Sequence, residues 1–118
     1  MSAATVTQSK KVVVLISGNG SNLQSILDAS GGNYLPHTKV SLVVSNKKDA
    51  YGLKRAENAN VPTLYFPLKP YTSAGKTREE YDEDLAKEIK NLVPDIDLVV
   101  LAGWMHILSW VFIQLYFL

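Results

Sequence analysis

The feature that most constrains the fold is a short aliphatic run followed at once by a glycine-rich turn. Residues 12–16 read Val-Val-Val-Leu-Ile, which is typical of a strand buried on both faces of a parallel sheet. Residues 17–22 read Ser-Gly-Asn-Gly-Ser-Asn, and apolar residues then recur at helical spacing between Leu23 and Leu27. We therefore predict a strand, a tight turn and a helix that stops at Gly31 and Gly32.

The same alternation continues along the chain. A second strand is predicted at residues 40–44, with a helix that Asp49 caps and that ends by Pro62. A third strand is predicted at residues 63–66, followed by a polar loop at residues 69–76.

The helix that follows this loop has a more specific start signal than the two helices before it. Thr77 and Glu80 have the spacing of a capping box, and an apolar stripe follows at Tyr81, Leu85, Ile89 and Leu92, with a stop at Pro94. A fourth strand is predicted at residues 98–101. Strands that alternate with helices in this way predict an α/β fold, with a parallel sheet and helices on both faces. Ligands then bind beyond the carboxyl ends of the strands.

Composition excludes several function classes. The 118 residues carry twelve Lys and Arg against eleven Asp and Glu, a formal charge of +1, so we expect no nucleic-acid partner. The chain has no cysteine, which excludes disulfides, thiolate zinc sites and cysteine nucleophiles. Its two histidines, His37 and His106, are unrelated in the sequence, and we predict no metal site. The first residues have no apolar core like that of a signal peptide, and a cytoplasmic setting is expected.

The glycine-rich turn is a candidate anion site. Gly18 and Gly20 let the backbone approach a ligand, and Ser21 and Asn22 open a helix whose free amides favour a phosphate. The alternative is a tight turn that binds nothing. A dinucleotide fingerprint is excluded because Leu23 stands where it requires a glycine, and no complete Walker motif supports ATP binding.

Four motifs in order resemble the phosphoribosylglycinamide formyltransferase family, the folate-dependent formyltransferases of purine biosynthesis. The resemblance covers residues 11–109. The segments that carry it are Val14-Leu15-Ile16-Ser17-Gly18-Asn19-Gly20-Ser21-Asn22-Leu23-Gln24, Ser45-Asn46-Lys47 with Tyr51-Gly52-Leu53, Thr77-Arg78-Glu79-Glu80-Tyr81-Asp82, and Leu101-Ala102-Gly103-Trp104-Met105-His106-Ile107-Leu108-Ser109.

The resemblance implies a Rossmann-like formyltransferase fold that is incomplete at the C-terminus. It also implies transfer of a formyl group from 10-formyltetrahydrofolate, as co-substrate, to the amine of glycinamide ribonucleotide. By resemblance, the residues that hold the phosphate and ribose are Gly20, Ser21 and Asn22, and those that contact folate are Arg78, Met105, His106, Ile107 and Leu108. Bacterial members usually have arginine where His106 stands. This histidine lowers folate affinity little if the backbone of residue 106 contacts the folate. If the side chain makes the contact, folate affinity is in doubt. Taken alone, His106 is expected to be a bystander rather than a base.

No catalytic residue is assigned in this chain. In the family an Asn, a His and an Asp catalyse the transfer, and all three lie beyond the stretch that ends at Ser109. We expect a disordered N-terminal segment at residues 1–10, the N-terminal part of a formyltransferase domain at residues 11–109 and an apolar tail at residues 110–118. The isolated chain is expected to be inactive.

The tail allows more than one interpretation. No charged side chain occurs from residue 98 to residue 118, a length that just spans a bilayer. Gly103, His106, Ser109 and Gln114 argue against a membrane anchor, and an incomplete enzyme is the favoured interpretation. The alternatives are a non-catalytic phosphate-binding or interaction module and another folate-dependent formyltransferase or hydrolase of the same fold. An exposed sheet edge and the apolar tail would favour self-association.

Overall fold

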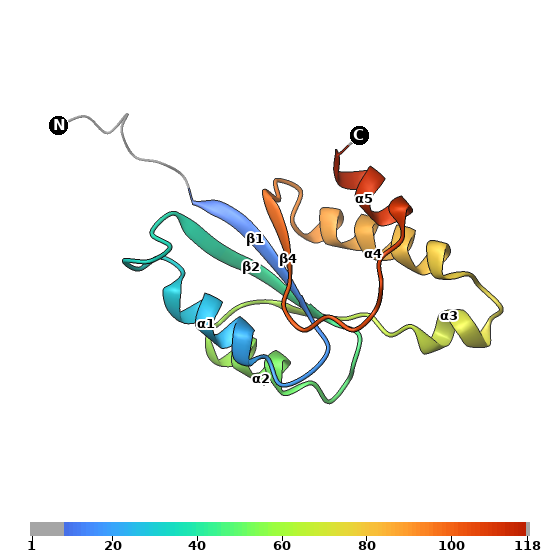
Figure 1. The fold of residues 1–118 in the computed structure, drawn as a ribbon, viewed down its shortest axis with the longest axis horizontal. Coiled ribbons are helices and arrows are strands. Elements are labelled where there is room, and N and C mark those ends of the chain that lie inside the picture. Colours follow the sequence, from blue (N-terminus) through green and yellow to red (C-terminus); the bar gives the residue numbers. More distant parts are fainter. Residues whose placement is uncertain (1–8, 118) are drawn as a thin grey trace.

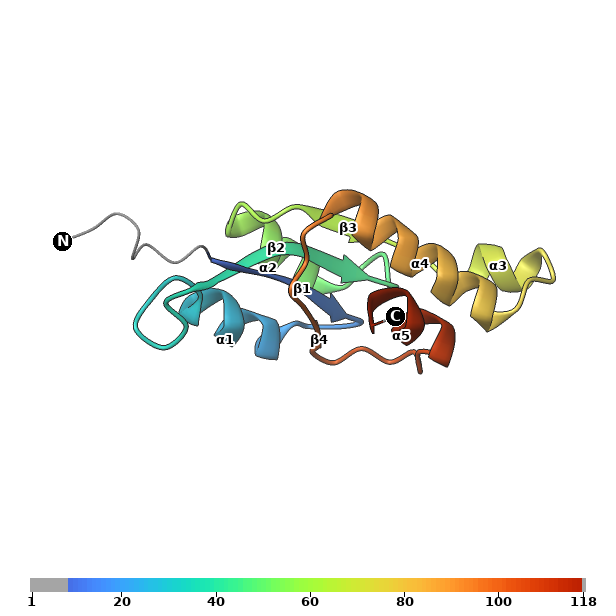
Figure 2. The same ribbon diagram turned by 90° about the horizontal axis from the view of Figure 1, so that it is seen from above.

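A parallel sheet with helices on both faces forms the body of the molecule (Figures 1 and 2). The computed structural model describes residues 9–117, and side chains as far as residue 114. Its strands are β1 (Lys10–Ile16), β2 (Thr38–Ser45), β3 (Thr63–Tyr65) and β4 (Leu98–Leu101), in the order β3-β2-β1-β4. All pair in parallel, which confirms the predicted fold class. Residues 1–8 of the segment predicted to be disordered lie outside the described residues.

The alternating side chains of β1 build two cores. Val13 and Leu15 face α4 (Arg78–Leu92) and α5 (Trp110–Phe117). Val12, Val14 and Ile16 point to the other face of the sheet and its layer of helices. That layer contains α1 (Ser21–Ala29) and α2 (Tyr51–Asn58). Because β1 lies between β2 and β4 and is covered on both faces, residues 13–16 of β1 are completely buried. The aliphatic run therefore has the environment that the sequence predicted.

The predicted capping box is confirmed: its side chains form hydrogen bonds with the free backbone amides at the start of α4. The Thr77 hydroxyl accepts from the Glu80 amide at 3.2 Å, and the Thr77 amide donates to the Glu80 carboxylate at 3.2 Å. This capping box starts α4 at the predicted position. Of the predicted stripe, Tyr81, Leu85 and Ile89 are buried, but Leu92 is 49% exposed because it lies at the last residue of the helix.

Two local predictions were wrong. Ala50, not Asp49, is the N-cap of α2, and no side chain caps that helix. The segment predicted as a polar loop contains a short helix, α3 (Lys69–Ser73), with proline near its start. Proline fits there because the first helical amides need no intrahelical acceptor.

The C-terminal part of the sheet has an apolar surface. β4 is an edge strand, and Leu98 and Leu101 are more than half exposed along it. α5 folds back onto α4 and buries Phe112 in the core, while Trp110 remains 63% exposed. Among the described residues, no helix has the length and apolar character needed to cross a membrane.

Candidate functional site

The glycine loop leaves the start of α1 open. Gly20 is the N-cap, with φ of +81°, and no side-chain hydrogen bond caps the helix. The first amides of an α-helix have no intrahelical acceptor, and they carry the positive end of the helix dipole. Ser21 and Asn22 are exposed beside them. The loop therefore has the geometry of an anion site, in contrast to α4, whose first turn is closed by its own capping box.

Helix α2 holds this loop through a glycine-to-glycine contact. The Gly52 amide donates to the Gly18 carbonyl at 3.1 Å. A Cβ atom on Gly20 would lie 2.7 Å from the Cα of Gly52, and one on Gly52 would lie 2.2 Å from Cδ1 of Ile16. The two backbones can touch only because both residues lack a side chain. Sequence reasoning gave Gly52 no role, although it lies in one of the motifs that carry the resemblance.

Arg55 fixes the loop from the same helix. Its Nε donates to the Asn19 carbonyl at 2.8 Å and its Nη2 to Asn19 Oδ1 at 2.6 Å. A further bond from Nη1 reaches Gln24 Oε1 at 3.2 Å, and the guanidinium lies 4.9 Å from the centre of the Tyr51 ring. This arrangement places a fixed positive charge next to the open helix start, which adds to the attraction for an anion. Sequence reasoning missed Arg55, because nothing in its local pattern separates it from a solvated charge.

Ser17 connects the glycine loop to the neighbouring strand ends. Its hydroxyl donates to Asn46 Oδ1 at 2.7 Å and accepts from the Met105 amide at 2.9 Å, and its own amide donates to the Gly103 carbonyl at 3.1 Å. Ser17 is 8% exposed. The carboxyl ends of β1, β2 and β4 thus converge, as expected for a ligand crevice in a parallel sheet.

The segment after β4 alternates between exposed and inward-facing side chains. Met105 is 77% and Ile107 is 75% exposed, whereas the side chain of His106 is only 7% exposed and Leu108 is half-buried. Within the described residues, no backbone hydrogen bond joins residues 106–108 to another backbone group. Met105 and Ile107 are therefore not core residues. The backbone groups of residues 106–108 remain for other partners, whereas the Met105 amide is bonded to Ser17.

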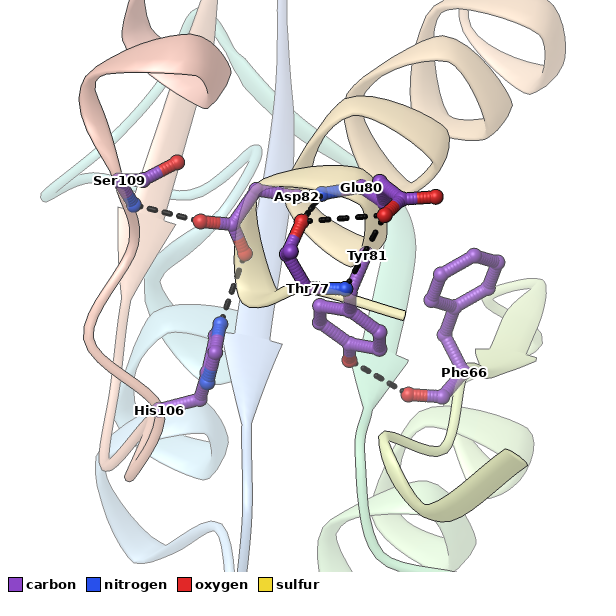
Figure 3. A network of polar contacts seen from close by, with 7 residues as sticks. All are labelled: Phe66, Thr77, Glu80, Tyr81, Asp82, His106 and Ser109. Carbon is purple, nitrogen blue, oxygen red and sulfur yellow. Dashed lines mark hydrogen bonds and ion pairs between the residues drawn. The ribbon is translucent and has the colours of Figure 1, made fainter. Parts of the chain in front are cut away.

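The His106 side chain is packed in the interior and paired with a carboxylate. Its Nε2 lies 2.7 Å from Oδ1 of Asp82, and Oδ2 of the same carboxylate accepts from the Ser109 amide at 2.6 Å (Figure 3). The imidazole also packs edge-on against Tyr81, with the ring centres 5.0 Å apart. Sequence reasoning missed this pair, because nothing in the local pattern separates Asp82 from a solvated charge.

Arg78 makes no described contact with this segment. It is exposed at the first residue of α4, one helical turn from Asp82, so the two share a face of the helix. Arg78 thus lies one helical turn from the carboxylate that holds residues 106 and 109, and His37 lies apart from that carboxylate. His37 precedes β2, and its carbonyl accepts from the Lys10 amide at the opposite end of the sheet.

Two tyrosines, Tyr81 and Tyr71, pack edge-on against each other beside His106. The Tyr81 hydroxyl donates to the Phe66 carbonyl at 2.6 Å (Figure 3), and burial, followed by the nearby Asp82 charge, raises the pKa of Tyr81. Desolvation, followed by a hydrogen bond to Asp84, raises the pKa of Tyr71 to about 12. Both phenols are therefore neutral at physiological pH, and they act here as hydrogen-bond donors.

An apolar groove lies beside the segment, between β4 and α5. Its volume is about 580 Å³, and its lining includes Leu101, Trp104, Ile107, Phe112 and Ile113. Within the part of the chain that the structure describes, no group of His, Cys, Asp and Glu side chains could hold a metal ion.

Comparison with known proteins identifies relatives of this arrangement. The formyl transferase family model matches residues 10–118. The phosphoribosylglycinamide formyltransferase of Escherichia coli is 50% identical over 105 residues, covering 89% of this chain and 46% of the relative. The enzyme of the same name from Schizosaccharomyces pombe is 50% identical over 102 residues, covering 83% of this chain and 48% of the relative.

Solved structures agree. The phosphoribosylglycinamide formyltransferase of Coxiella burnetii superimposes with a TM-score of 0.80 at 38% identity, covering 93% of this chain and 48% of that one. The Campylobacter jejuni protein of the same name gives a TM-score of 0.79 at 40% identity, covering 92% and 55%. The chain thus spans about half the length of the curated relatives that it matches.

Proposed function

The chain belongs to the formyl transferase family, and we propose that it carries the substrate-binding part of a phosphoribosylglycinamide formyltransferase of purine biosynthesis. The observation that carries the proposal is the glycine loop. Gly52 and Arg55 hold it in a shape that leaves the amides at the start of α1 open. This geometry suits a phosphate monoester, and the relatives of this chain are named for a ribonucleotide substrate.

The proposed reaction divides the work between two parts of the crevice. Gly20, Ser21 and Asn22 would hold the phosphate and ribose of glycinamide ribonucleotide. Arg78 and the segment 105–108 would hold 10-formyltetrahydrofolate, the co-substrate. The substrate amine attacks the formyl carbon and forms a C–N bond, the bond from that carbon to N10 of the folate breaks, and a proton passes from the amine to N10. In this scheme the residues of this chain bind and orient the two substrates.

The hydrogen bond from the Met105 amide to Ser17 supports placing the two substrates side by side. It joins the proposed folate segment to the residue that precedes the glycine loop, at 2.9 Å. A formyl donor on one wall and an amine on the other would meet beyond the end of β1. Holding the two reactants together in this way is a major source of rate enhancement.

Binding of the ribonucleotide is tested by placing a negative charge at the loop. Ser21→Glu is expected to weaken glycinamide ribonucleotide binding at least tenfold, since a carboxylate about 4 Å from a phosphate costs about 1–4 kcal/mol. The fold should be retained, because an acidic residue in the first turn of a helix is favourable. Isothermal titration calorimetry measures the affinity.

The matched control is Ser25→Glu, which adds the same charge one helical turn further along α1, also at an exposed position. This control should bind within about threefold of the unmodified chain. Ribose 5-phosphate and inorganic phosphate, titrated in parallel, separate a ribonucleotide site from a general phosphate-binding module. Equal affinities for Ser21→Glu and the unmodified chain would refute the proposed loop site.

The apolar edge supports self-association of the isolated chain. Leu98 and Leu101 are 55% and 53% exposed on an edge strand, and Trp110 on α5 is 63% exposed. Such surfaces pair with other copies unless they are covered. Size-exclusion chromatography at increasing concentration is expected to show species larger than a monomer, and Leu98→Lys should shift them toward the monomer. A single monomeric peak at all concentrations would contradict this expectation.

A further inference from the structure

Asp82 is a buried carboxylate for which the proposed reaction has no direct use. Its side chain is 0% exposed, and it lies on the face of α4 that packs toward the sheet. Burying an ionised carboxylate is costly unless hydrogen bonds compensate for the lost water. Here both oxygens are occupied, one by His106 and the other by the Ser109 amide (Figure 3).

These two partners lie on either side of Ile107 and Leu108, two of the residues proposed to line the folate pocket. His106 Nε2 donates to the carboxylate, since an ionised carboxylate only accepts, and Ser109 donates from its backbone three residues later. One carboxylate therefore anchors both ends of a short stretch to α4. The Met105 amide is anchored separately, to Ser17.

The anchoring determines which groups of the stretch are exposed. With His106 and Leu108 turned inward, Met105 and Ile107 face outward, and residues 106–108 make no backbone hydrogen bond to other backbone groups in the described part of the chain. A planar heterocycle with donors and acceptors on its edge could pair with such a backbone. The His106 side chain, whose Nε2 is already bonded to Asp82, would not make that contact.

We propose that Asp82 is a positioning residue: through His106 and Ser109 it fixes the segment 105–108 in the shape that binds the pterin ring of the folate. The inference rests on the proposed function. It also accounts for histidine at position 106, because the required property there is a donor that reaches Asp82 rather than a side chain that contacts the folate.

Asp82→Asn tests the inference in the full 118-residue chain. The amide keeps the shape of the carboxylate but loses the charge and one acceptor. The affinity for 5-formyltetrahydrofolate, a stable isomer of the proposed co-substrate, is expected to fall at least tenfold, whereas glycinamide ribonucleotide binding should stay within twofold. A merely structural role would weaken both ligands together, and that result would overturn the proposal.

The matched control is Asp84→Asn on the same helix. The Asp84 carboxylate accepts from the Tyr71 hydroxyl at 2.8 Å and makes no described contact with the segment. The Asp84→Asn substitution should therefore leave folate affinity unchanged. A second pair of variants tests His106: His106→Ala should weaken folate binding, and His106→Arg should restore it because a guanidinium also donates to the carboxylate.

A ligand-independent measurement separates this inference from the proposed function. Hydrogen exchange of the Ser109 amide, followed by NMR, is expected to be at least tenfold faster in Asp82→Asn than in the unmodified chain. If the unmodified chain binds no folate, the proposed folate site fails, whatever the exchange rates show. If it binds folate and Asp82→Asn binds equally well, or if Ser109 exchange is unchanged, the positioning role is refuted while the folate site stands.

Discussion

Gly52→Ala is expected to destabilise the chain by about 1–3 kcal/mol, the usual cost of forcing extra volume into a packed interior, and to abolish detectable ribonucleotide binding. The new methyl group would lie 2.2 Å from Cδ1 of Ile16 and 3.3 Å from Cα of Gly20. Ile16 is completely buried in the central strand, so its side chain has little room to turn away. Relief must therefore come from moving α2 away from the glycine loop, which distorts the proposed phosphate site.

Urea denaturation measures the stability loss, and calorimetry with glycinamide ribonucleotide measures the binding. Gly18→Ala is the matched control, because a Cβ atom there has no heavy atom within 4 Å and the residue does not need a positive φ. It should unfold within about 0.5 kcal/mol of the unmodified chain, as surface substitutions do. If Gly52→Ala were as stable as Gly18→Ala and bound the ribonucleotide equally well, the glycine contact would not shape the loop.

The sequence predicted those features that depend on local pattern. Three patterns each indicate a conformation within a few residues: the aliphatic run of β1, the capping box of Thr77 and Glu80, and the glycine turn. Their order along the chain then predicts the parallel sheet, because a strand, a helix and a further strand form a right-handed crossover. The convergence of the Ser17, Asn46 and Met105 regions at one edge of the sheet follows from that topology.

The features that the sequence did not predict depend on contacts between distant segments. Gly52 resembles any glycine near the start of a helix, and only the approach of α2 to Gly20 gives it a role. Asp82 resembles a solvated charge until the segment 24 residues later reaches it. The sequence also left open whether the residue at position 106 contacts the folate through its backbone or its side chain, because the answer depends on the direction in which the loop after β4 turns. The buried pair with Asp82 shows that the side chain faces the interior.

The isolated 118-residue chain is expected to transfer no formyl group above background. Formyl transfer needs a group that takes a proton from the amine and a donor for the developing oxyanion. The chain has two histidines. The Nε2 of His106 is bonded to Asp82 in the interior, and His37 lies at the opposite end of the sheet. Losing the general base alone reduces a rate by about 10²–10⁴-fold.

The assay follows the mass of formylated ribonucleotide with 10-formyltetrahydrofolate as donor, and the Escherichia coli relative serves as the positive control under the same conditions. Substrate binding without turnover would mean that this chain binds and orients the two reactants. The groups that transfer protons would then belong to the part of the longer relatives that this chain does not match. Turnover within about a hundredfold of that relative would contradict this division of labour. In that case His106→Asn, assayed at saturating folate, would show whether the buried imidazole leaves Asp82 to act as the base, because a positioning role alone predicts weaker folate binding with an unchanged rate at saturation.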